Sequence, residues 1–115
     1  MPQTPRIEQS VDLTLRHEGD LVVAAGGHLR VLGVVTGSIE VEGDGRLKVR
    51  GLVEGDVRVL RGGRAEITGT VNGRVTVEDR GALTLAGVVT VAVDAAPGAR
   101  VRLRPGAIVA EERQA

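Results

Sequence analysis

Apolar residues recur at every sixth position along most of the chain. Sixteen of the seventeen positions in this series are apolar, although only 42% of the chain is hydrophobic. Apolar and polar residues also alternate around these positions, as at Leu47, Val49 and Val53. This alternation predicts short strands with one buried face. The series is Val11, His17, Val23, Leu29, Val35, Val41, Leu47, Val53, Val59, Ala65, Val71, Val77, Leu83, Val89, Ala95, Val101 and Ala107.

Glycine adds a second period of eighteen residues. Its three registers are Gly27, Gly45, Gly63 and Gly81; Gly33, Gly51, Gly69 and Gly87; and Gly19, Gly37, Gly55 and Gly73. A fixed period near twenty residues indicates a solenoid of stacked repeats. Each unit of eighteen holds three apolar hexads, so we expect three short strands per coil with glycines at the corners.

The two periods together predict an all-β fold, a triangular, single-stranded β-helix (β-solenoid) with about 18 residues per coil and about 5.5 coils. We expect the solenoid over residues 11–109, a flexible polar tail over 1–10 and a short tail over 110–115. The predicted inward columns include Val11, Leu29, Leu47, Ala65, Leu83 and Val101, and also Val35, Val53, Val71, Val89 and Ala107.

The ends of such a rod are candidate assembly sites. A coil cannot bury its inner face alone, and the terminal coils expose strand edges and apolar side chains. The candidate end-to-end residues are Val11 and Leu13 at one end, and Leu103, Ile108 and Val109 at the other. Proline cannot donate to a strand ladder, so we expect Pro97 and Pro105 to weaken pairing at the C-terminal end.

A second candidate surface lies on one side of the rod. The alternation places Val34, Leu52 and Val88 in one outward column, and Leu32 also points outward. Three exposed apolar residues in line on a flat sheet suggest a lateral contact face.

Composition narrows the function. The chain has 115 residues, fifteen basic and fifteen acidic, and neither cysteine nor aromatic residues. The balanced charge predicts no nucleic-acid partner. The absence of cysteine removes disulfides and thiolate metal sites. No apolar run is long enough for a membrane span, and the first ten residues lack the apolar core of a signal peptide. We therefore expect a cytoplasmic protein.

Enzyme chemistry finds little support in the residues. His17 and His28 fall at different coil positions, and the glycine-rich turns lack a P-loop pattern, so we expect no catalytic, cofactor or metal site. Arg102 belongs to a column with Arg30 and Lys48 that Glu66 interrupts, which indicates a solvated face. Hexapeptide-repeat acyltransferases share the six-residue period and remain an alternative.

Three segments carry a resemblance to a known family. They are Val35–Val41, Val53–Val59 and Val71–Val77, which share a V-x-G-x-I/V-x-V pattern in one register. The pattern resembles the bactofilins, a family of polymer-forming bacterial cytoskeletal proteins. The resemblance implies a right-handed β-helix that stacks end to end into nucleotide-independent filaments, and a scaffold role for cell-envelope proteins, with peripheral placement at the inner membrane through partners. The alternative function is a discrete solenoid of the adaptor or immunity type that binds a protein partner without polymerising.

Overall fold

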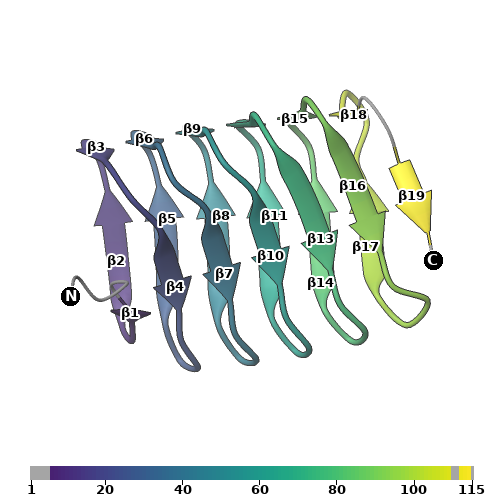
Figure 1. The fold of residues 1–115 in the computed structure, drawn as a ribbon, viewed down its shortest axis with the longest axis horizontal. Helices are drawn as coiled ribbons and strands as arrows, with labels where there is room; N and C mark the ends of the chain where they lie inside the picture. The colour runs from purple at the N-terminus through teal and green to yellow at the C-terminus, as the bar shows by residue number, and fades with distance from the viewer. Residues whose placement is uncertain (1–5, 110–111, 115) are drawn as a thin grey trace.

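The computed structural model describes residues 6–109 and 112–114, and over these residues it contains strands and turns but no helix. The chain winds into a rod of 35 × 24 × 23 Å, with successive coils stacked along its long axis and the two termini at opposite ends (Figure 1). Three parallel sheets form its three sides. The predicted β-solenoid with about 18 residues per coil is therefore confirmed, and it has about six coils.

Each side of the rod is one sheet, here called A, B and C. Sheet A contains β1 (Arg6–Ile7), β4 (Leu21–Val23), β7 (Ile39–Val41), β10 (Val57–Val59), β13 (Arg74–Val77), β16 (Ala92–Ala95) and β19 (Glu112–Gln114). Sheet B contains β2 (Ser10–Leu13), β5 (His28–Val31), β8 (Arg46–Val49), β11 (Arg64–Ile67), β14 (Ala82–Leu85) and β17 (Arg100–Leu103). Sheet C contains β3 (Arg16–His17), β6 (Val34–Val35), β9 (Leu52–Val53), β12 (Thr70–Val71), β15 (Val88–Val89) and β18 (Ile108–Val109).

The core consists of inward columns in which each residue lies on its equivalent eighteen positions later. Leu29 pairs with Leu47, Val53 with Val71, and so on through the middle coils. These residues are fully or almost fully buried, and among the residues whose burial the structure describes, none that is polar or charged is buried with them. Small branched side chains fill the narrow triangular interior because identical neighbours interdigitate along each column.

The corner between sheets A and B is a four-residue turn. In the turn from Leu60 to Gly63, the amide of Gly63 donates to the carbonyl of Leu60 at 2.9 Å. The third residue of most of these turns has a positive φ: it is 81° at Gly62, and 64° at both Asp44 and Arg80. Glycine adopts this conformation without the steric cost that an L side chain carries, but Asp44 and Arg80 show that the position does not require glycine. The glycine register at this corner follows one residue later and is explained by close approach, because a Cβ atom on Gly63 would lie 2.9 Å from the carbonyl oxygen of Val41.

The corner between sheets B and C is tighter, with two residues between strands. The amides of Thr68 and Gly69 both donate to the carbonyl of Val49, at 2.8 and 2.9 Å. The bend brings the backbone of one coil so close to the next that a side chain on Gly69 would overlap the carbonyl oxygen of Gly51. Glycine is therefore required here by close approach and not by its φ.

The corner between sheets C and A adds a ladder of side chains. The backbone amide of Ser38 donates to Oδ1 of Asp20 at 2.8 Å, and that of Asp56 donates to Oγ of Ser38 at 3.2 Å. The amide of Arg74 then donates to Oδ1 of Asp56 at 2.9 Å. Each short polar side chain thus satisfies a backbone donor one coil further along the rod.

The terminal coils depart from the eighteen-residue spacing. Ile7 pairs with Val23, sixteen residues away, so β1 lies inside the segment predicted as a tail. At the other end Val89 pairs with Val109, twenty residues away, and the predicted pairing of Val89 with Ala107 is wrong. The turn Arg104–Ala107, closed by a 3.0 Å hydrogen bond, holds the two extra residues. Strand β19 likewise extends past the predicted boundary at 109, and the right-handed winding stays a prediction.

Candidate assembly surfaces

The N-terminal end of the rod leaves its inward columns only partly covered. Val11 and Leu13 of β2 continue the columns of Leu29 and Val31, and they pack against the core while remaining partly exposed. Leu29 and Val31, one coil further in, are 0% exposed. The difference arises because no strand of sheet B lies beyond β2 among the described residues.

The C-terminal end is open in the same way. Leu103 continues the column of Leu85 and is 43% exposed, whereas Leu85 is fully buried. Val109 continues the column of Val89 and is partly buried. Ile108 also lies on the last strand at this end, but it continues the outward column of Val88 and not an inward column, and it is 61% exposed.

Backbone edges accompany these apolar ends. The last strands of the three sheets are β1, β2 and β3 at one end, and β17, β18 and β19 at the other. Pro97 lies in a turn of the A–B corner and Pro105 in the turn Arg104–Ala107, so neither proline interrupts β17 or β18. The strand edges therefore keep their backbone donors and acceptors for pairing with another strand.

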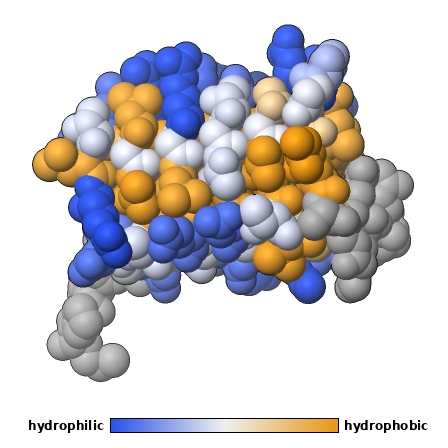
Figure 2. Space-filling view, turned by 90° about the horizontal axis from the view of Figure 1, so that it is seen from above, coloured by the Kyte–Doolittle hydropathy of each residue, from blue (hydrophilic) through white to orange (hydrophobic). Residues whose placement is uncertain are grey.

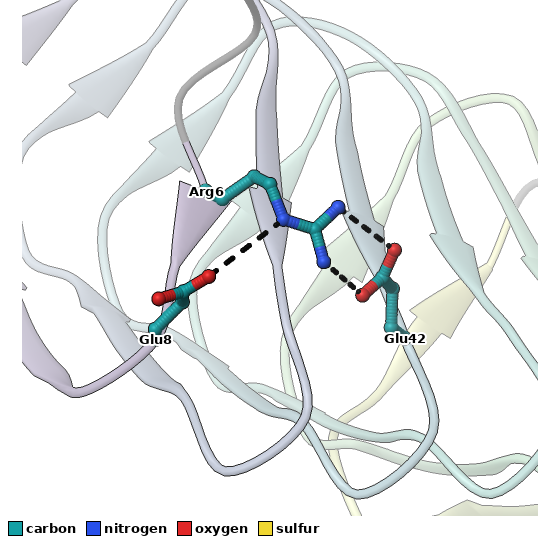
Figure 3. Close-up of polar contacts among 3 residues, drawn as sticks. All are labelled: Arg6, Glu8 and Glu42. Carbon is teal, nitrogen blue, oxygen red and sulfur yellow. Dashed lines mark hydrogen bonds and ion pairs between the residues drawn. The ribbon is translucent and has the colours of Figure 1, made fainter.

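An ion pair holds the first strand in place. Arg6 of β1 donates to both carboxylate oxygens of Glu42, at 2.7 and 3.2 Å, and its Nε lies 4.0 Å from Glu8 (Figure 3). Glu42 follows β7, so the guanidinium reaches across β4 to the next strand of sheet A. The hydrogen bonds and charge of Glu42 raise the pKa of Arg6, which keeps the guanidinium charged.

His17 takes an inward position at the N-terminal end. It pairs with Val35 at the start of a column that otherwise consists of valines, and its Nε2 is buried without a hydrogen-bond partner. A buried polar atom without a partner costs free energy. His17 is also the one polar residue in the series of every sixth position.

The outer face of sheet C carries an apolar ridge. Val34, Leu52, Thr70, Val88 and Ile108 follow one another in register along its strands. Leu32, in the neighbouring B–C corner, is 37% exposed. Figure 2 looks onto this face and shows the apolar band running along the rod between polar flanks. The four residues predicted as a lateral face thus lie together, although their role as a contact stays a prediction.

The described residues contain no group of three or more histidine, cysteine, aspartate or glutamate side chains arranged to hold a metal ion. They also include no helix that is long and apolar enough to cross a membrane. His28 lies on the outer face of sheet B and His17 in the inward column of sheet C, so the two imidazoles belong to different faces.

Comparison with known proteins finds a match between the chain and the model of one protein family. The model of the family called Bactofilin, described as polymer-forming cytoskeletal, matches residues 9–110. No curated protein and no solved structure shows a significant match to the chain. The matched segment spans all but the terminal strands β1 and β19 of the rod.

Proposed function

The chain belongs to the bactofilin family of polymer-forming cytoskeletal proteins, and on this premise we propose that it assembles end to end into nucleotide-independent filaments. The family is a cytoskeletal one and not a family of enzymes. The observation that carries the proposal is the pair of open ends. Each end combines partly exposed members of the inward columns with strand edges that pair with no other described strand.

End-to-end stacking would continue the interior of the rod. Leu103 and Val101 at the C-terminal end belong to the same columns as Leu13 and Val11 at the N-terminal end. Contact between two ends would bury these side chains and pair the free edges of the sheets, so apolar burial and backbone hydrogen bonds would act together. No nucleotide site is needed for this reaction, because folding of the protomer already provides both surfaces.

The apolar ridge supports a second contact in the same assembly. We propose that Leu32, Val34, Leu52 and Val88 pack laterally, between filaments or against a client protein. An apolar stripe on a flat sheet suits such packing, and Ile108 extends it toward the C-terminal end. The clients would be cell-envelope proteins held near the cytoplasmic face of the inner membrane, as the family resemblance implies.

Electron microscopy of the purified chain tests the proposal. Filaments in negative stain, formed without added nucleotide and sedimenting at high speed, are the expected result. A sharp monomer or dimer across a range of concentrations, with nothing in the pellet, would contradict end-to-end assembly and favour a discrete protein-binding solenoid.

A further inference from the structure

We propose that the outer face of sheet B binds a short acidic segment of a partner protein, laid along the rod in extended form. This inference rests on the proposed scaffold function and names the chemistry of one client. The site is a basic groove, defined here by Arg46, Arg64, Arg80 and Arg100. Its lining also includes His28, Lys48 and one acidic residue, Glu66, whose carboxylate lies 3.9 Å from Lys48. The groove is distinct from the ends and from the apolar ridge of sheet C.

The charges of the described residues are distributed unevenly around the rod. Six cations form ion pairs, namely Arg6, Arg16, Arg30, Lys48, Arg58 and Arg74. Eight exposed arginines form none with any described residue, and all eight lie on sheet B or its two flanking corners: Arg46, Arg50, Arg61, Arg64, Arg80, Arg100, Arg102 and Arg104. With Arg30 and Lys48, sheet B and its flanking corners carry ten basic residues against seven acidic ones, so this side of the neutral chain has an excess of positive charge.

The arrangement of these arginines is unfavourable without a counter-charge. Arg46 and Arg64 occupy directly paired positions on β8 and β11, and His28 pairs with Arg46 on the other side. Like charges placed opposite each other on neighbouring strands destabilise a sheet. On the same face Arg30 is paired with Asp12 at 3.1 Å, and Lys48 lies 3.9 Å from Glu66. The neighbouring column has no such acidic partner among the described residues.

The groove has the size of a short peptide. Its volume is about 890 Å³, and glycines of the A–B corner together with Ala82 leave room between the arginine side chains. Ala82 takes the position between Arg64 and Arg100 in the column. From His28 to Arg100 the groove crosses four strand spacings, roughly 19 Å, which an extended segment of about six residues spans.

Carboxylates on a peptide fit this face better than phosphates on a larger polymer. The described part of the rod offers no aromatic side chain, and the whole sequence has none, so bases would find no stacking surface. A duplex or a membrane would also meet the acidic residues beyond sheet B, and a chain of zero net charge attracts neither over distance. Guanidinium groups bind carboxylates through paired hydrogen bonds, which a short flexible segment can satisfy.

Fluorescence anisotropy with fluorescein-labelled hexaglutamate and the 115-residue chain tests the proposal. We expect saturable binding that weakens when salt is raised, and no binding of labelled hexaglutamine. The triple variant R46Q/R64Q/R100Q should weaken hexaglutamate binding at least about tenfold. The matched variant R16Q/R58Q/R74Q removes the same charge from ion-paired positions elsewhere and should change the affinity less than twofold.

The same measurements also test other occupants of the groove, namely DNA, an anionic membrane and a second copy of the chain. Equal losses in the two triple variants, or no binding of hexaglutamate to the parent chain, would overturn the proposal. So would tighter binding of a 20-base-pair DNA duplex or of phosphatidylglycerol vesicles. If R46Q/R64Q/R100Q abolished lateral bundling and left peptide binding intact, the occupant would be a second copy, and the proposal would be wrong. Sedimentation of the same samples reports filament formation, so failure of the groove and failure of end-to-end assembly are distinguishable.

Discussion

Gly69 lies directly above Gly51, so close that a Cβ atom on Gly69 would overlap the carbonyl oxygen of Gly51. The same contact recurs from Gly51 to Gly33 and from Gly87 to Gly69. The overlapping atoms are backbone atoms of neighbouring coils, held by hydrogen bonds to the buried strands of sheet B. The glycine register at this corner therefore sets how tightly the coils can stack.

Replacing Gly69 with alanine should destabilise the rod by about 2–3 kcal/mol, because neither coil can move away without losing backbone hydrogen bonds. Gly62→Ala is the matched control, since its Cβ would meet nothing closer than 3.6 Å and only its φ of 81° is unfavourable. That control should cost about 1 kcal/mol. Urea unfolding followed by circular dichroism measures both, and equal costs would show that close approach is not the constraint.

Replacing His17 with valine should stabilise the protein by about 1 kcal/mol, because it removes the buried Nε2 atom that lacks a partner. Valine also matches Val35 and Val53 in the same column. His28→Val serves as the control, because His28 is only partly buried on the outer face of sheet B. It should change stability by less than about 0.5 kcal/mol. A lower stability of His17→Val would indicate that the imidazole has a partner in the assembled protein.

Changing Leu103 to glutamate should raise the concentration needed for filament assembly at least about tenfold, because stacking would bury a carboxylate at the C-terminal end. Val91→Glu is the control. Val91 is 46% exposed, close to the 43% of Leu103, but it lies in the C–A corner and does not belong to an inward column that stacking would continue. Pelleting assays across protein concentrations compare the two. Similar effects of both changes would argue against end-to-end contact through Leu103.

Changing Leu52 to glutamate should separate laterally associated filaments and leave their length unchanged, because Leu52 lies in the middle of the apolar ridge. Thr76→Glu introduces the same charge on the outer face of sheet A and should leave bundles intact. Filament width in negative stain is the measurement. Bundles of normal width with Leu52→Glu would exclude the ridge as a lateral contact.

The middle of the rod could be predicted from sequence because its spacing is constant. Leu29, Leu47 and Ala65 are eighteen residues apart, and each pairs as the period requires. The pairing of the terminal strands could not be predicted, because the spacing changes there. Ile7 pairs with a residue sixteen positions later in a shorter first coil, and Val109 pairs with a residue twenty positions earlier because of the additional turn before β18. The eighteen-residue period of the middle coils contains no information on these different spacings at the two ends.

The candidate surfaces were only partly visible in the sequence. Val34, Leu52 and Val88 could be aligned because they share one outward column of a regular repeat. The basic groove was missed because it depends on where charges lie around the rod and not on their sum. Arg46 and Arg64 become neighbours of Arg80 only when a sheet and its corner are seen together.

The interchangeable middle and irregular ends of the rod have a consequence for how such a protein changes its size. Removing or duplicating one complete eighteen-residue unit between β5 and β14 would leave every remaining column in register, so length can vary in whole steps while cross-section stays the same. The terminal coils, with offsets of sixteen and twenty residues, cannot be exchanged in this way. Duplication of a middle repeat in the gene would therefore lengthen the rod by one coil, whereas duplication of a terminal coil would put the columns out of register.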